Sequence, residues 1–207
     1  MSCPCKGLLA HGLAVDEVSN LTRQKAAQHL AEQTGRQMIK GDISTERLAG
    51  FLFANATGGW ILVEQRDPLV RRRFTIAHEL GHYLLHFLPE LESALVRQDE
   101  DLMEFEEQMS APPPEKTADE NEMGTGQAIL SDGIGEGMNA LDQESLEKQA
   151  DAFAAAILMP ETTCQRLIQK YADRGMGARA VLARRLASEC LVSEAAMNRR
   201  LTDLHLP

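Results

Sequence analysis

The stretch RRRFTIAHELGHYLLH, from Arg71 to His86, restricts what this chain can fold into more than any other segment. Its histidines His78 and His82 are four residues apart, so they share one face if the segment is helical. Apolar residues fill most positions around them, which predicts a helix buried on several sides from about Val70 to Phe87, ending before Pro89. Unpaired buried histidines are costly, so a metal site explains the pattern better than surface histidines do.

The five residues from His78 to His82 read HELGH, which is the HExxH pattern of zinc peptidases. In this pattern the two histidines bind the ion. Glu79 can then act as the general base, because its carboxylate reaches a metal-activated water without occupying a ligand position. Gly81 costs roughly 1 kcal/mol relative to alanine inside a helix, which predicts that another backbone or a substrate approaches it closely.

A third ligand has to come from elsewhere in the chain. Position 88, where an extended metzincin pattern has histidine, is Leu88. His86 lies eight residues beyond His78, or about 12 Å along a helix, which is too far for both to hold one ion. We therefore expect His86 to pack near the ligands without binding the ion.

The later segment Gln143 to Met159 predicts a second helix that ends at Pro160. Its residues Glu147 and Asp151 are four apart, and the apolar run that follows them favours a buried helix over a solvated acidic one. We expect Glu147 to be the third ligand and Asp151 to accept a hydrogen bond from a ligand histidine. Two histidines, one glutamate and an open position form a catalytic Zn²⁺ site, and overlapping preferences leave Mn²⁺ or Fe²⁺ as alternatives.

Together, RRRFTIAHELGHYLLH and EKQADAFAAAILMP resemble the ImmA/IrrE family of metallo-endopeptidases, and the tail VSEAAMNRRLTDLHL resembles its helical end. The resemblance implies an α+β fold, a minimal gluzincin in which a small antiparallel sheet packs on the HExxH helix and a Glu-bearing helix, with a C-terminal helical region. It also implies His78, His82 and Glu147 as ligands and Glu79 as the base. The implied substrate is a partner protein, typically a helix-turn-helix repressor, in stress or mobile-element control. Asp151 stands where family members often have asparagine.

The pattern of helix, strand and breaker signals divides the chain into five segments. The first two are an N-terminal tail (1–20) and an N-terminal part of the metallopeptidase domain (21–98), with strands expected at 48–53 and 60–64. An acidic insertion (99–141) follows. The third-ligand helix with the next helix (142–173) and a C-terminal helix-turn-helix-like region (174–207) complete the chain.

The insertion departs from the family pattern and has its own composition. It holds 12 acidic residues and one basic residue, together with the run Pro112-Pro113-Pro114. Dense like charge and low hydrophobicity predict a largely mobile segment near the site, with a short docking helix open around Met103 and Phe105.

Partners and compartment follow from what the sequence lacks. No apolar stretch is long enough to span a bilayer, and the run from Gly7 to Val15 is a poor signal peptide. Four irregularly placed cysteines are typical of reduced thiols, so we expect a cytoplasmic protein. The net charge of −10 argues against general nucleic-acid binding. The oligomeric state stays open.

Two alternatives and two details stay open at this point. The helix pair 178–190 and 193–204 could belong to a metal-binding, DNA-binding regulator without protease activity. A dead protease that only docks is the other alternative, although an intact Glu79 argues against it.

An extended substrate is expected to pair with the strand 60–64 as a sheet edge. The candidates for oxyanion stabilisation are Arg73, Tyr83, Tyr171 and His205.

Overall fold

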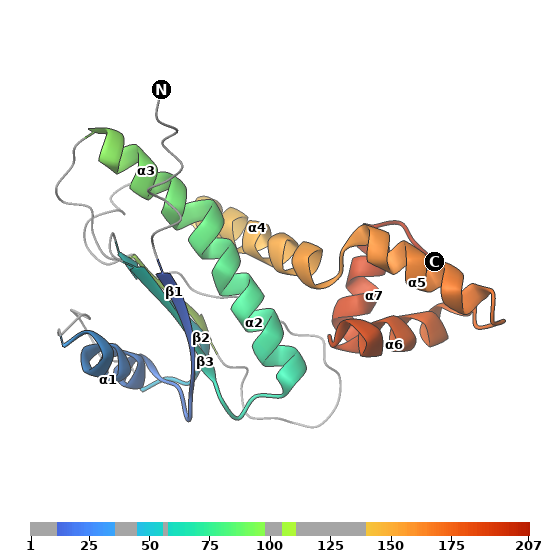
Figure 1. Cartoon of the computed structure of the whole chain (residues 1–207), viewed down its shortest axis with the longest axis horizontal. Coiled ribbons are helices and arrows are strands. Elements are labelled where there is room, and N and C mark those ends of the chain that lie inside the picture. The colour runs from blue at the N-terminus through green and yellow to red at the C-terminus, as the bar shows by residue number, and fades with distance from the viewer. Residues whose placement is uncertain (1–11, 36–44, 56–57, 98–104, 111–139) are drawn as a thin grey trace.

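The structure, a computed structural model, describes residues 12–35, 45–55, 58–97, 105–110 and 140–207 (Figure 1). The strands are β1 (Gly12–Val18), β2 (Leu48–Asn55), β3 (Gly58–Glu64) and β4 (Phe105–Ser110). The helices are α1 (Arg23–Thr34), α2 (Leu69–His82), α3 (Leu88–Arg97), α4 (Ala140–Leu158), α5 (Glu161–Ala172), α6 (Arg179–Cys190) and α7 (Glu194–Asp203), and a π-turn, η3 (Tyr83–Phe87), joins α2 to α3. The predicted α+β class is confirmed.

The four strands form one sheet in the order β1-β3-β2-β4. The expected pair of strands around the NATGG turn is present as β2 and β3, which run antiparallel with Leu52 opposite Ile61. The sheet is not wholly antiparallel, because β1 runs parallel to β3. Two neighbouring parallel strands must be joined by a crossover connection. Between β1 and β3 this connection contains α1 and β2. Strand β1 also means that the expected tail 1–20 contributes seven residues to the sheet.

Helices cover both faces of this sheet. Side chains alternate along β2, so Phe51 and Phe53 face α1 and pack with Leu30, whereas Leu52 faces Tyr83 on the other side. All eight residues of β2 except Asn55 are buried. Helix α2 and the turn after it therefore pack against a buried central strand.

Helix α2 continues beyond the position where Pro89 was expected to end it. The π-turn η3 follows His82, and the N–H of Leu88 donates to the carbonyl of Tyr83. Proline clashes with the carbonyl four residues earlier in a regular helix. The wider π-turn directly before Pro89 changes that geometry, so α3 can follow as far as Arg97.

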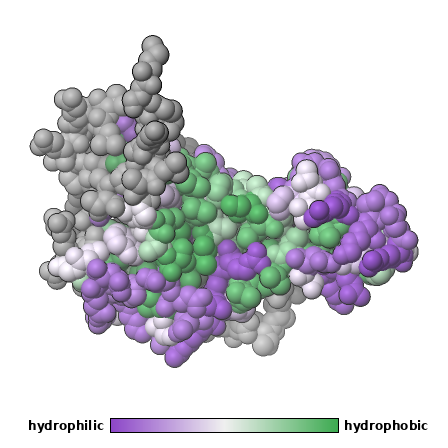
Figure 2. Space-filling view, in the orientation of Figure 1, coloured by the Kyte–Doolittle hydropathy of each residue, from purple (hydrophilic) through white to green (hydrophobic). Residues whose placement is uncertain are grey.

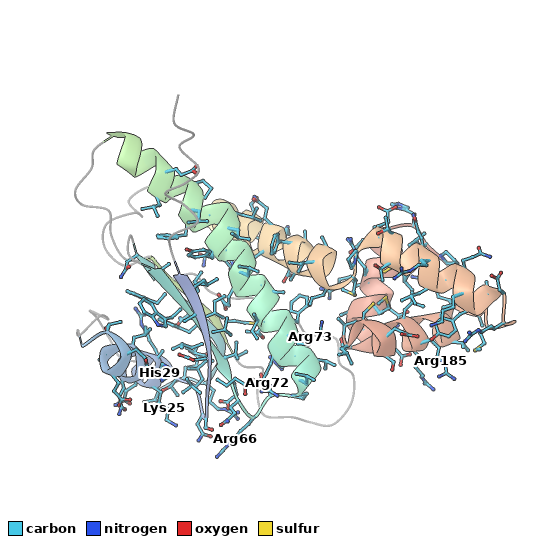
Figure 3. The ribbon with its side chains drawn as sticks, in the orientation of Figure 1. Lys25, His29, Arg66, Arg72, Arg73 and Arg185 are labelled. Atoms are coloured by element: carbon cyan, nitrogen blue, oxygen red, sulfur yellow. The ribbon has the colours of Figure 1, made fainter. Side chains whose placement is uncertain are left out.

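The C-terminal helices α5, α6 and α7 match the expected segments and form a unit with its own core. Residues of all three helices contribute, including Cys164, Leu186 and Leu201. Figure 3 shows Arg73 of α2 reaching toward this unit, where its Nη1 donates to the carbonyl of Cys190 at 3.2 Å. The C-terminal unit is thus tied to the HExxH helix by the Arg73 side chain and to α4 by the chain connection before α5.

Part of the predicted acidic insertion has regular structure. Residues 105–110 form β4, antiparallel to β2, so the short helix expected around Met103 and Phe105 is wrong at Phe105. A six-residue segment with two glutamates can add to a sheet when an apolar strand offers its edge. Met103 and the rest of the segment up to residue 139 lie outside the described residues, as do Cys3 and Cys5. No helix in the described ranges is long and apolar enough to cross a membrane.

Glu64 anchors the loop between β1 and α1. It is buried, and its carboxylate accepts hydrogen bonds from the backbone N–H groups of Asn20 (3.1 Å), Leu21 (2.7 Å) and Arg66 (3.0 Å). Burial alone would raise the pKa of Glu64, but these donors outweigh it and hold the pKa below its usual value.

We expect Glu64→Gln to lower the free energy of unfolding by about 2 kcal/mol at pH 7, because charge-assisted bonds to a buried group are lost. A lowered folded-state pKa adds stability above the unfolded pKa, and this stability disappears as the pH falls through the folded value. The difference between parent and variant in urea unfolding should therefore shrink in acid. Glu144→Gln, in an exposed pair with Lys148, is the control and should unfold at nearly the same urea concentration as the parent. Equal unfolding midpoints for parent and Glu64→Gln at pH 7 would contradict this role.

Candidate metal centre

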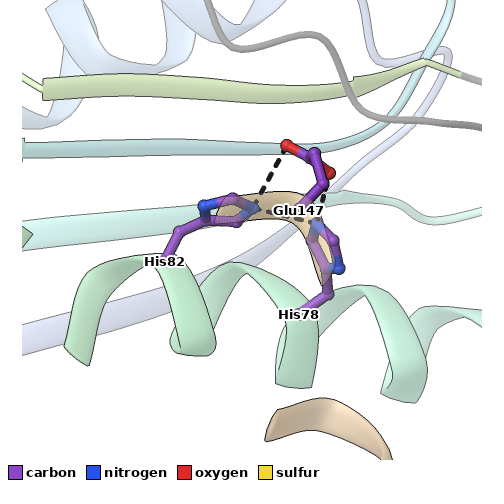
Figure 4. Close-up of side chains that lie close together, drawn as sticks. All are labelled: His78, His82 and Glu147. Carbon is purple, nitrogen blue, oxygen red and sulfur yellow. Dashed lines mark hydrogen bonds and ion pairs between the residues drawn. The ribbon is translucent and has the colours of Figure 1, made fainter. Parts of the chain in front are cut away.

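Two helices that are far apart in sequence bring the predicted ligands together. His78 and His82 project from α2, and Glu147 projects from α4 between them (Figure 4). The helices approach closely at Gly81, where an added Cβ would lie 3.1 Å from the Cα of Ala150. This confirms the expectation that another backbone approaches Gly81. Ala150 is three residues after Glu147, so the same contact sets how far the glutamate stands from the histidines.

The three side chains converge through the atoms that bind metals. The Nε2 atoms of His78 and His82 are 3.0 Å apart. The Glu147 carboxylate places one oxygen 3.3 Å from Nε2 of His78 and the other 3.5 Å from Nε2 of His82. One ligand atom from each residue fits within a set whose members lie no more than 4.8 Å apart. Two imidazoles and a carboxylate suit a divalent cation.

Electrostatics favour positive charge at this point. Burial opposes protonation of His78, but hydrogen bonds to Asp151 and Glu147 outweigh burial and raise the pKa of His78 to about 10. Burial, with the neighbouring His78 and His86, lowers the pKa of His82 to about 2. The carboxylates around His78 therefore favour a positive charge at this point, which a divalent cation would supply.

Each ligand histidine has a partner on its far nitrogen. Nδ1 of His78 lies 2.9 Å from Oδ1 of Asp151, as predicted from the four-residue spacing of Glu147 and Asp151. Nδ1 of His82 lies 3.0 Å from Nδ1 of His86. His86 therefore lies beside His82 and is not among the three converging residues. Burial lowers the pKa of His86, while the side chain of Gln149 opposes this.

Glu79 is fully buried next to the ligands. Neither of its carboxylate oxygens has a hydrogen-bond partner among the described residues. Burial raises the pKa of Glu79 to about 7, although the adjacent His78 lowers it. A buried carboxylate without a donor is destabilising, so its presence here is explained by a ligand that the site is built to take. A cation with a water molecule satisfies this requirement, and the residues present therefore fit a metal.

Gly50 of β2 makes room for Glu79, and sequence reasoning missed it. An added Cβ at Gly50 would lie 2.4 Å from Cγ2 of Thr75 and 2.7 Å from Oε1 of Glu79. The available signal was a glycine inside an otherwise apolar strand, which often marks a close approach. The pairing of β2 with β4 also shifts register between Leu48 and Gly50.

We expect Gly50→Ala to lower the free energy of unfolding by about 2 kcal/mol, because the new methyl group overlaps α2 and the structure must move to admit it. Gly12→Ala is the matched control, since a Cβ at Gly12 meets nothing within 4 Å. Urea unfolding of both variants tests this expectation. If the Gly50→Ala protein were as stable as Gly12→Ala, α2 would have to move aside without any loss of unfolding free energy, which would contradict this expectation.

The prediction that residues 60–64 form the edge strand that docks substrate is wrong. Strand β3 pairs with β1 on one side and β2 on the other, so residues 60–64 offer no free edge. Order within a sheet depends on strands distant in sequence, which local patterns do not reveal. Among the described strands, β4 lies at an edge, and its Met109 Sδ is 3.8 Å from Oγ1 of Thr75 on α2.

The candidates for oxyanion stabilisation are all engaged or placed elsewhere. Arg73 donates to Cys190, and the Tyr171 hydroxyl donates to Glu189 at 2.6 Å. Tyr83 is buried with its ring stacked on Phe87, and His205 is exposed in the C-terminal unit. None of these contacts involves the three ligands, so the oxyanion partner stays unassigned.

A comparison with protein families identifies a match over most of the chain. The family model described as Peptidase_M78, IrrE N-terminal-like domain, matches residues 31–113 and 123–202, which is most of the chain. The first matched segment contains His78 and His82, and the second contains Glu147. A search of curated proteins found no match.

Proposed function

Because this chain belongs to the Peptidase_M78 family of IrrE N-terminal-like domains, and hence to a family of peptidases, we propose that it is a metal-dependent endopeptidase that cuts a specific partner protein. The observation that carries the proposal is the convergence of His78, His82 and Glu147 beside the buried carboxylate of Glu79. A purely structural metal site has no use for that carboxylate.

His78, His82 and Glu147 would hold the ion, with Zn²⁺ as the best match to this donor set and Mn²⁺ or Fe²⁺ as alternatives. When bound, such an ion is a Lewis acid that polarises a peptide carbonyl and lowers the pKa of a water molecule to about 7. Asp151 keeps His78 oriented through its Nδ1 atom. Glu79 takes a proton from the attacking water and passes it to the amine nitrogen that leaves when the peptide bond breaks.

The substrate we propose is an extended segment of a regulatory protein. The edge of β4 lies next to α2, and a sheet edge can bind an extended chain through main-chain hydrogen bonds. A flexible linker meets this requirement better than a folded core. The resemblance of the two motifs to the ImmA/IrrE family supports a helix-turn-helix repressor, acting in a stress response in the cytoplasm.

The test is cleavage by the Zn²⁺-loaded protein, first of the products of neighbouring genes and then of casein. We expect one partner to be cut at a defined bond and casein to survive catalytic amounts of the protein. Broad digestion of casein would refute the narrow specificity and leave the peptidase assignment standing, provided that Glu79→Gln abolishes it. Absence of cleavage of every neighbouring product would leave the repressor proposal without support.

The alternative, a DNA-binding regulator, has less support in the structure. Helices α6 and α7 do form a helix-turn-helix-like pair. However, Arg200 donates to the carbonyl of Met159. An arginine engaged with the backbone of its own chain is less available for phosphates. A salt-dependent mobility shift with duplex DNA would favour the alternative.

A further inference from the structure

We infer that His86 is a positioning residue, which holds His82 in the one tautomer that can bind a cation. The inference rests on the proposed metal centre and goes beyond it, because it assigns a task to a histidine outside the ligand set. It follows from where the ring nitrogens of the two residues lie.

His82 faces the ligand cluster with Nε2, which is 3.0 Å from Nε2 of His78 and 3.5 Å from the Glu147 carboxylate. A neutral imidazole carries its proton on one nitrogen and a lone pair on the other. For Nε2 to bind a cation, the proton of His82 must be on Nδ1. That N–H is buried and requires an acceptor.

Nδ1 of His86, at 3.0 Å, is placed to accept it. The ring centroids of His82 and His86 are 5.0 Å apart and the ring planes are inclined by 62°. This is an edge arrangement that directs one nitrogen at the other, and it differs from stacking. His86 lies within the π-turn that starts directly after His82. Such turns inside helices recur at functional sites.

The two ligand histidines are therefore held differently. The Nδ1 atom of His78 meets the Asp151 carboxylate, which accepts from any direction and has no tautomers. The Nδ1 atom of His82 meets an imidazole, which accepts only if its own proton is on Nε2. Nε2 of His86 is buried on the side toward α4, where Gln149 approaches it without completing a hydrogen bond of ordinary length. The acceptor role at Nδ1 places the proton of His86 on Nε2, which is the ring nitrogen on the side of Gln149.

The test compares His86→Leu with His86→Asn. Leucine removes the acceptor and keeps an apolar side chain of similar size, whereas the Oδ1 atom of asparagine can take the place of Nδ1. Zn²⁺ affinity is measured by competition with a chromophoric chelator. We expect His86→Leu to weaken Zn²⁺ binding about 10- to 100-fold, as loss of partners to ligand histidines does, and His86→Asn to recover most of the affinity. Leu85→Asn, at an exposed position of the same π-turn, is the control and should bind Zn²⁺ like the parent.

Parent-like affinity in His86→Leu, or equal losses in the leucine and asparagine variants, would overturn the inference. If His86→Leu does not fold, NMR of the Zn²⁺-loaded parent decides. A scalar coupling between the Nδ1 atoms of His82 and His86 across an N–H···N bond is expected, and its absence contradicts the assignment. Failure of the parent to bind Zn²⁺ would instead refute the metal centre itself.

Discussion

Glu79→Gln is expected to abolish peptide hydrolysis and to leave metal binding intact. Glutamine has the shape of the buried glutamate but cannot accept a proton from the attacking water. Removing a general base costs about 10² to 10⁴ in rate, so we expect kcat to fall by about a thousandfold. Since Glu79 does not belong to the converging ligand set, metal content should equal that of the parent. The measurements are kcat on the cleaved partner and the metal-to-protein ratio of the purified variant.

Glu92→Gln provides the control, because Glu92 is an exposed glutamate on the helical extension that follows the HExxH helix. It should keep both activity and metal. Undiminished hydrolysis by Glu79→Gln would remove Glu79 from the mechanism, while a parallel loss of metal would show that it contributes to ion binding.

His78→Ala, His82→Ala and Glu147→Ala should each lose most of their metal affinity. Four-ligand structural zinc sites bind with about 10 to 16 kcal/mol, or roughly 3 to 4 kcal/mol per ligand. Loss of one ligand should therefore weaken binding about 10² to 10³-fold. Titration with Zn²⁺ against a competing chelator, followed by metal analysis after dialysis, measures this loss in all three variants.

His29→Ala is the matched control for these substitutions. His29 pairs with Asp16 on the far side of the sheet from α2, outside the ligand cluster, and its loss should not change metal affinity. If Glu147→Ala binds Zn²⁺ as tightly as the parent, the third ligand is another residue and the α2–α4 assignment fails.

The ligand set could be predicted from the sequence because most of it depends on spacing within single helices. A four-residue separation placed His78 and His82 on one face of α2, and the same separation linked Glu147 to Asp151 on α4. The glycine cost at Gly81 likewise signalled the contact with α4. These features are local, and in the structure the side chains of His78, His82 and Glu147 converge.

The rest of the site depends on contacts between distant segments. The parallel pairing of β1 and the edge position of β4 follow from which strands meet, and hydrophobic patterns do not determine this. The strand from Phe105 to Ser110 was not predicted, because the acidic composition of the surrounding segment favoured a mobile insertion. The role of Gly50 depends on the side chain of Glu79, which belongs to another element. Proline was expected to end the helix before Pro89, but the π-turn there lets a further helix follow.

The surface along α2, η3 and α4 has large apolar side chains that are exposed to solvent. Figure 2 shows hydrophobic surface in the region of these helices, and Leu84, Leu85 and Ile157 are among the exposed apolar residues. Helices α2 and α4 approach closely at Gly81, which lies against Ala150 and Phe153.

The origin of the ligands on two separate helices has a thermodynamic consequence. An ion bound to α2 and α4 together binds the folded chain and not the unfolded one, so it stabilises folding by mass action, by about 4 kcal/mol at a thousand times its dissociation constant. The helix pair is thereby cross-linked without a covalent bond. If the proposed centre binds its ion, the supply of metal would affect the stability of the fold as well as the capacity to act, and a chelator would lower both together.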